Sequence, residues 1–196
     1  VIPLEFEGDE AYFVVFGEKT KVDSFELTRE ELKHTVSLKG PWTVEFQAGR
    51  GAPASMEFPE LKSWTDCNID GVKYFSGTAI YRKTFEFHSL GGSDFLNLGE
   101  VGCIARVFLN GKDVGLAWKA PYILDVTGEL RGGKNELEIH VTNLWVNRLI
   151  GDARPGAGEK YTYTSFKFYK GDDPLIPSGL MGPVMLESLH HLAPSR

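Results

Sequence analysis

Short segments in which apolar and polar residues alternate recur along this chain, and they constrain its fold more than any other feature. Residues 42–46, 78–87 and 137–142 each place apolar side chains at nearly every second position. Because successive side chains of a strand point to opposite faces, each segment predicts a strand with one buried and one wet face. Asn110-Gly111 lies between β-prone residues and predicts a type I′ hairpin turn, since both turn positions need positive φ.

Further segments extend this pattern over most of the chain. Strands are predicted for 161–169 and 184–189, and the sequence from Asp125 to Gly133 predicts one capped helical turn ended by glycine. We expect the rest of 143–183 to form long loops. The chain has 22 Gly, 10 Pro and 12% aromatic residues, a composition typical of short strands joined by tight turns. Many strands, few helices and no βαβ spacing predict an all-β, antiparallel sandwich.

The N-terminal part of the sequence has a different character. Two alternating runs within residues 1–20, separated by a Gly-containing segment, predict a hairpin or a sharp corner. Residues 21–35 are charged and polar, which favours a linker or an exposed helical turn capped by Thr28, with Glu31 completing a capping box. We therefore expect a domain boundary within this polar stretch.

Charge and hydropathy exclude several classes of function. The formal net charge is −6 and the pI is near 5.4, whereas sequence-independent nucleic-acid binding needs an excess of Lys and Arg to displace counterions. No apolar run approaches the ~20 residues that cross a bilayer, and the start of the chain lacks the basic and apolar regions of a signal peptide. We therefore expect neither a nucleic-acid partner nor a membrane partner.

The cysteines and histidines give little indication of a metal or cofactor. Cys67 and Cys103 could form one disulfide or remain two buried thiols, and two cysteines are too few for a four-ligand zinc site. His190-His191 lacks a third ligand at a recognisable spacing, and His140 lies on the wet face of its strand. These residues predict no metal site and no cofactor.

Six segments, taken in order, resemble the sugar-binding domain of glycoside hydrolase family 2 and its relatives. They are GPWTV at 40–44, YFSGTAIYR at 74–82, VFLNGKDVG at 107–115, PYILDVT at 121–127, GKNELEIHVTN at 133–143 and SGLMGPVML at 178–186. The resemblance covers residues 36–188. It implies a jelly-roll β-sandwich of the galactose-binding-like group, and it leaves residues 189–196 as a short tail.

Two segments narrow the resemblance. Residues 143–152 and 174–182 look most like the C-terminal region of family 106 α-L-rhamnosidases and similar large bacterial glycosidases, and residues 13–19 look like the final strand of a preceding β-domain. The resemblance implies a fragment of a longer polypeptide, exported to the periplasm or the cell surface, whose signal peptide and catalytic domain lie upstream. It also leaves a structural Ca²⁺ open, because many galactose-binding-like sandwiches hold one.

A glycosidase needs two carboxyl groups beside the scissile bond, roughly 5 to 9.5 Å apart. Carboxylates at predicted strand ends or in loops are Glu100, Asp125, Asp152, Asp172 and Asp173. With 27 acidic residues in the chain, such positions arise by coincidence, and caps, turns and surface solvation explain them better than catalysis. We therefore predict no catalytic residue.

Carbohydrate binding has better support, because sugars are held by flat aromatic faces and by polar side chains on rigid loops. Trp42 alternates with core positions and is assigned to the core. Trp118 lies between the hairpin and a proline turn, and residues 148–154 follow the strand at 137–142, where a salt-bridged loop is the alternative to a sugar contact. The candidate sugar-binding residues are Trp118, Tyr122, Trp145, Arg148, Asp152 and Arg154.

Three hypotheses for function remain. The first is a non-catalytic accessory sandwich of a larger bacterial glycoside hydrolase, which supports the catalytic domain of the same polypeptide and contributes a loop to glycan binding. The second is an autonomous carbohydrate-binding module, and the third is a complete small glycosidase. Under the first hypothesis the isolated chain holds only part of the sugar contacts and binds no tighter than about millimolar.

Overall fold

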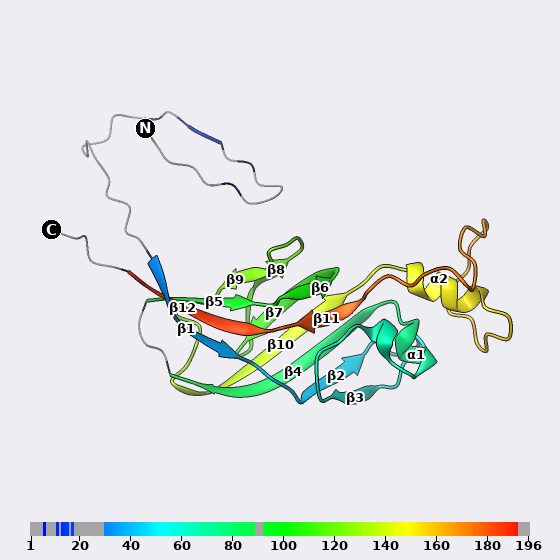
Figure 1. Ribbon diagram of the computed structural model, residues 1–196, viewed down its shortest axis with the longest axis horizontal. Helices are drawn as coiled ribbons and strands as arrows, with labels where there is room; N and C mark the ends of the chain where they lie inside the picture. The colour runs from blue at the N-terminus through cyan, green and yellow to red at the C-terminus, as the bar shows by residue number, and fades with distance from the viewer. Residues whose placement is uncertain are drawn as a thin grey trace.

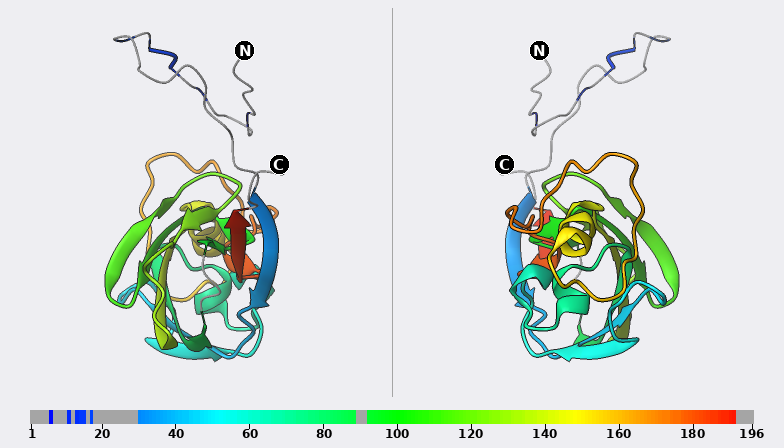
Figure 2. Two further views of the ribbon diagram at one scale, coloured as in Figure 1. Left: turned by 90° about the vertical axis from the view of Figure 1, so that its left-hand side faces the viewer. Right: turned by 90° about the vertical axis from the view of Figure 1, so that its right-hand side faces the viewer.

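The computed structural model describes residues 30–88 and 92–191, together with Phe6, Ala11, residues 13–15 and Gly17. Within these residues the strands form three sheets, and every pairing between named strands is antiparallel. The end-on views of Figure 2 show the strands in two layers around a common interior. This arrangement confirms the predicted all-β antiparallel sandwich.

One layer is a six-stranded sheet, seen along its length in Figure 1. In spatial order its strands are β3 (Ser55–Phe58), β2 (Trp42–Phe46), β4 (Thr78–Phe87), β10 (Gly133–Thr142), β7 (Ile104–Leu109) and β8 (Lys112–Ala117). The other layer is a four-stranded sheet with the order β1 (Glu30–Ser37), β12 (Met185–His191), β5 (Ser93–Asn97) and β9 (Ile123–Asp125). A small sheet pairs β11 (Gly179–Gly182) with β6 (Glu100–Gly102).

Three short helical segments complete the described part of the chain. They are the 3₁₀ turn η1 (Trp64–Asp66) and the α-helices α1 (Asp70–Lys73) and α2 (Val146–Ala153). In Figure 1, α1 and α2 both lie toward the right-hand end of the sandwich. Because α2 follows β10 directly, it extends the end of the six-stranded sheet.

The core is built from the alternating positions that the sequence predicts. Trp42 and Val44 of β2, and Ile139 and Val141 of β10, are fully buried, whereas their sequence neighbours are partly or fully exposed. The buried set continues in the opposite layer with Leu96 of β5 and other residues of the same cluster. A spacing of two residues thus places one face of each strand in the shared interior.

The predicted hairpin is present. β7 and β8 pair on either side of Asn110 (φ 54°) and Gly111 (φ 82°), the positive values that a type I′ turn requires at both positions. The strands predicted at 42–46, 78–87 and 137–142 are also present as β2, β4 and the larger part of β10.

The N-terminal boundary differs from the prediction. The predicted helical turn and linker overlap β1, which begins at Glu30, and the predicted tail overlaps β12, which ends at His191. These two strands pair with each other from Glu30 opposite His191 to Ser37 opposite Met185. Backbone hydrogen bonding to a partner strand therefore gives the polar segment a strand conformation that its side-chain pattern does not indicate. Thr28 and most of residues 1–20 lie outside the described residues.

One local prediction is wrong, and a second holds only in part. Residues 161–169 form no strand, because no neighbouring strand pairs with them and most of their side chains are exposed. The predicted helical turn after Asp125 is a tight turn, in which the Asp125 carboxylate accepts from the Thr127 amide at 2.9 Å and Val126 O accepts from Glu129 N at 3.0 Å. Asp125 thus caps a single turn, as predicted, but the positive φ of 78° falls at Gly128, before the glycines at 132–133 where the sequence predicts its end.

Candidate carbohydrate-binding end

One end of the six-stranded sheet gathers most of the predicted sugar-binding residues. The strand register aligns Ala117, Ala105, Val141, Ala79 and Phe46 across the sheet. The chain leaves β8 at Trp118 and β10 at Asn143 just beyond this row. Residues far apart in the sequence therefore meet at one end of the sandwich, where the loops carry side chains that the core does not use.

The helix α2 lies at this end, where the sequence predicts a loop. Val146, Leu149 and Ile150 follow the i, i+3, i+4 spacing of a helical face, a signal that the glycine and polar residues of the segment obscure. Gly151 is needed rather than disruptive, because a Cβ there would lie 2.7 Å from the Tyr74 side chain. The close approach holds α2 against the residue that follows α1.

A buried ion pair stabilises α2. Arg148 Nη2 lies 2.8 Å from Asp152 Oδ1, and the two side chains are only 8% and 6% exposed. The Arg148 guanidinium also lies over the ring of Tyr161 at 5.3 Å from its centroid. Burial and these contacts make Arg148 a structural residue, which agrees with the salt-bridged alternative to a sugar contact.

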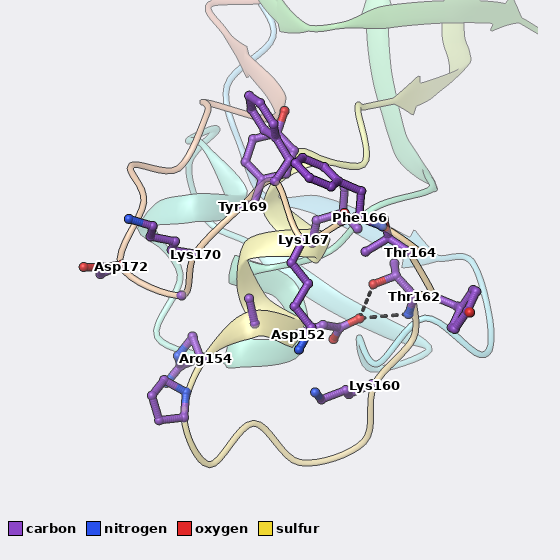
Figure 3. Close-up of a pocket in the computed structure, with 16 residues that line it drawn as sticks. Asp152, Arg154, Lys160, Thr162, Thr164, Phe166, Lys167, Tyr169, Lys170 and Asp172 are labelled. Carbon is purple, nitrogen blue, oxygen red and sulfur yellow. Dashed lines mark hydrogen bonds between the residues drawn. The ribbon is translucent and has the colours of Figure 1, made fainter.

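Asp152 fastens the start of the 154–178 loop, the segment between α2 and β11. Its Oδ2 accepts from Tyr161 N at 3.0 Å, from Thr162 N at 2.8 Å and from Thr162 Oγ1 at 2.6 Å. Figure 3 shows this carboxylate beneath the loop, with its bonds to Thr162 dashed. Three hydrogen bonds to one oxygen give this carboxylate a structural role in holding the loop.

Asn147 holds the end of the same loop by hydrogen bonds, and it is not among the residues predicted from the sequence. Its Nδ2 donates to Ile176 O at 2.7 Å and to Ser178 Oγ at 3.0 Å, and its Oδ1 accepts from Ile176 N at 2.8 Å. Asn143 plays a related part at the root of the helix, where it donates to Phe75 O at 2.9 Å and accepts from Gly77 N at 3.0 Å. Polar side chains thus fix both ends of the loop.

The remaining candidates differ in accessibility. Trp118 is 65% exposed, and Trp145 is 48% exposed with the Arg50 guanidinium 4.8 Å from its ring centroid. Tyr122 is half-buried, and burial raises the pKa of its hydroxyl. Arg154 pairs with Asp70 at 2.8 Å and lies over the Tyr74 ring. The two tryptophans are therefore the accessible members of the predicted set.

An open pocket of about 920 Å³ lies between α2 and the 154–178 loop (Figure 3). Its lining combines basic, hydroxyl and aromatic side chains, chiefly Arg154, Lys160, Thr162, Tyr163, Thr164, Phe166, Lys167, Phe168, Tyr169 and Lys170. Of the predicted sugar-binding residues, Asp152 and Arg154 line it, and so does Asp172, a carboxylate for which the sequence favours a turn over catalysis. The alternation of rings, hydroxyls and lysines in residues 160–170 is the sequence signal that the strand prediction concealed.

Comparison with known proteins identifies the domain. Residues 64–168, more than half of the chain, match the family described as "Glycosyl hydrolase 2 galactose-binding domain-like". The chain belongs to this family. The jelly-roll sandwich expected from the resemblance is thus shown, and the pocket belongs to a galactose-binding-like domain of the kind found in glycoside hydrolases.

Two similar proteins are much longer than this chain. A Formosa agariphila protein named "Putative beta-glucuronidase" is 40% identical, and the match covers 83% of the chain and 16% of that protein. The solved rhamnosidase from Novosphingobium sp. PP1Y is 47% identical with a TM-score of 0.79, over 86% of the chain and 16% of that structure. A β-glucuronidase structure from Ruminococcus gnavus, 18% identical with a TM-score of 0.57 over 84% of the chain and 30% of its own, supports the fold alone. The chain thus spans about one sixth of its two more similar relatives.

Two other carboxylates considered for catalysis, Asp125 and Asp173, make hydrogen bonds within local turns. Hydrogen bonds from Thr127 lower the pKa of Asp125, which is opposite to what a general acid needs. Asp173 accepts from Lys170 N at 2.8 Å within a loop turn. Among the described residues, His, Cys, Asp and Glu form no group of three that could hold a metal ion.

The described residues also show the state of the two cysteines and the character of the helices. Cys67 and Cys103 are both free thiols, one buried and one half-buried, and burial raises the pKa of Cys67. None of the described helices has the length and apolar character to span a membrane.

Proposed function

We propose that the chain is a non-catalytic accessory sandwich of a larger bacterial glycoside hydrolase of α-L-rhamnosidase-like type. The observation that carries the proposal is the combination of family membership with a length of only 16% of the Novosphingobium rhamnosidase. Most of such an enzyme lies outside the matched part. The structural use of Asp152 supports the same view, because this carboxylate, one of two that line the pocket, holds the loop through three hydrogen bonds.

Its partner in this proposal is the catalytic domain of the same polypeptide. The exposed side chains of Trp118 and Trp145 and of the 154–178 loop offer a surface beside a substrate cleft, where the domain contributes weakly to glycan binding. We also propose export of the parent protein to the periplasm or the cell surface, which rests on the family resemblance and is testable by cell fractionation.

Hydrolysis assays test the absence of catalysis. The 196-residue chain is expected to release no aryl group from aryl rhamnosides or aryl glucuronides, while the full-length parent protein hydrolyses one of these classes. Turnover by the chain that survives repurification and disappears in Asp172→Asn would contradict the proposal. The same result would restore the hypothesis of a complete small glycosidase.

An autonomous carbohydrate-binding module is the second candidate, and the exposed tryptophans favour it. Calorimetric titration with neutral oligosaccharides separates the two. The accessory role predicts affinity no tighter than about millimolar. Micromolar binding that is lost in a Trp118→Ala, Trp145→Ala variant would instead identify a binding module.

A further inference from the structure

The pocket lining carries more basic than acidic side chains, with Arg154 and three lysines against Asp152 and Asp172, although the whole chain carries a net charge of −6. Lys160, Lys167 and Lys170 all line the pocket, and in the part of the chain that the structure describes no carboxylate lies within ion-pair distance of their Nζ atoms. Two acidic residues line the same pocket: Asp152 is paired with Arg148, and Asp172 lies beyond ion-pair distance of the three lysines. The pocket therefore presents unpaired cationic groups to whatever enters it.

The same pocket presents aromatic rings that the domain does not bury. Tyr163, Phe166 and Phe168 are 95%, 73% and 71% exposed. In the view of Figure 3, Lys170 lies at the left beside Asp172, Lys160 at the lower right and Lys167 between them, with Phe166 next to Lys167. Flat rings beside ammonium groups are suited to a ligand that combines a C–H face with negative charge.

The pocket is held in shape by the fold. Asp152 fixes the loop at residues 161–162, and Asn147 fixes it at Ile176. Its volume of about 920 Å³ is within the range of roughly 300–1,000 Å³ that small-ligand sites occupy. A loop fixed at both ends loses less freedom when it binds a ligand, which favours binding.

We propose that this pocket binds an acidic glycan, with the sugar against the rings and its carboxylate or sulfate groups facing Lys160, Lys167 and Lys170. A protein partner fits the lining less well. Aromatic residues are common in the buried core of protein interfaces, but lysine is depleted there, and this pocket has three lysines. The inference names the substrate class of the glycan contact proposed above and rests on it. It goes beyond the predicted set, of which only Asp152 and Arg154 line this pocket.

Titration followed by backbone amide chemical shifts tests the proposal on the 196-residue chain. The probes are α-1,4-linked trigalacturonate, its neutral methyl ester and a sulfated galactan trisaccharide. One or both acidic probes are expected to shift residues 160–170 and to bind at least about tenfold tighter than the ester, which corresponds to the gain from one or two charge-assisted contacts. The preference is expected to fall as salt rises from 50 to 500 mM, roughly as exposed ion contacts are screened.

Variants decide which groups carry the preference. Lys167→Gln with Lys170→Gln is expected to remove the preference for the acidic probe, and Phe166→Ala to weaken both acidic and neutral probes. Lys134→Gln is the matched control, because this exposed lysine lies at the other end of β10. Its binding should equal that of the unmodified chain.

Three results would overturn the proposal. The first is equal affinity for trigalacturonate and its ester, with no gain in affinity for the sulfated probe. The second is chemical-shift changes confined to Trp118 and Trp145. The third is no saturable shift up to about 20 mM probe, because binding that weak is far below specific recognition. Acetylation footprinting of the full-length parent gives a second measurement. Protection of Lys160 and Lys167 without glycan would show that a protein surface covers the pocket. The hydrolysis assay is independent of all these outcomes, so the accessory role can stand if the acidic preference fails.

Discussion

The sandwich and the α2 region are ordered by different kinds of interaction. In the sandwich, fully buried groups such as Val44, Tyr81 and Ile139 are mostly apolar and repeat at every second residue. In α2 the buried side chains include Asn147, Arg148 and Asp152, and the loop that follows exposes its aromatic residues. Apolar burial is non-directional and spread over many contacts, whereas the α2 region depends on a few directional bonds.

The two regions should therefore respond differently to single substitutions. Loss of one methyl group from a core costs about 0.5–1.5 kcal/mol. Loss of one member of a buried charged pair costs more, because its partner is left unsatisfied. The α2 region should therefore open separately from the sandwich and respond strongly to single substitutions. A binding surface set on such a region is held in position by a small number of identifiable residues.

The largest effect is expected from breaking the buried ion pair. Arg148→Ala leaves Asp152 charged and without its partner, and the loss of one member of a buried pair costs about 3–5 kcal/mol. Native-state hydrogen exchange should show the α2 amides exchanging about two to four orders of magnitude faster, while the strands of the six-stranded sheet keep most of their protection.

Arg82→Ala is the matched control on the sandwich. Arg82 lies 3.2 Å from Glu45 and also pairs with Glu138, but its side chain is 43% exposed. An exposed pair contributes about 0–1 kcal/mol, so this variant should change exchange little anywhere. If both arginine variants behaved alike, the distinction between the two regions would be lost.

The next largest loss of stability is expected at Tyr81, whose hydroxyl makes directional hydrogen bonds inside the mostly apolar sandwich. Its hydroxyl accepts from Trp64 Nε1 at 2.6 Å and from Leu180 N at 3.1 Å, and burial raises its pKa. Tyr81→Phe leaves two buried donors without an acceptor, and the free energy of unfolding should fall by about 2–4 kcal/mol in urea titration. Because Trp64 and Leu180 belong to the core cluster, the whole domain should be affected.

Tyr122→Phe is the control for the loss of a hydroxyl group alone. The Tyr122 hydroxyl makes no hydrogen bond within the described residues, and its side chain is half-buried. Its removal should change the free energy of unfolding by less than about 0.5 kcal/mol. A Tyr81→Phe variant as stable as the Tyr122→Phe variant would mean that the core does not depend on this hydroxyl.

The same distinction explains what the sequence could predict. Strands β2, β4 and β10 follow from period-two alternation, and the hairpin follows from Asn110-Gly111, because these signals are local. The polar β1 takes its conformation from pairing with β12, more than a hundred residues away. The bonds from Asp152 to Thr162 and from Asn147 to Ile176 are likewise specified by the folded arrangement. The sequence therefore does not predict the pocket, although its lysines and aromatic residues lie close together along the chain.

A smaller effect is expected at the hairpin, where local geometry acts without packing. Gly111 has a φ of 82°, and a Cβ there would meet no atom within 4 Å. Gly111→Val should therefore destabilise the domain by about 1–3 kcal/mol through backbone strain alone. Gly132→Val is the control, because Gly132 is equally open but its φ lies outside the positive range. Equal melting temperatures for the two variants would show that the hairpin tolerates a β-branched residue at positive φ.

The smallest effect concerns His140, on the outer face of β10. Partial burial, and then the charges of Arg82 and Arg106, lower the pKa of His140 below its usual 6.5. The adjacent Glu138 carboxylate contacts the imidazole but is also paired with Arg82, so its charge is shared.

The unfolded chain then takes up a proton on His140 at a higher pH than the folded domain does. Stability from this residue is complete above pH 6.5 and declines as the pH falls through the folded pKa. Titration of the His140 ring proton by NMR should give a midpoint below 6.5, and His140→Gln should flatten the decline in stability between about pH 7 and 5. A midpoint above 6.5 would mean that Glu138 dominates. In that case this partly buried pair would stabilise the sandwich by about 1.4 kcal/mol for each unit by which the measured pKa exceeds its usual value, and directional contacts would matter there as well as in α2.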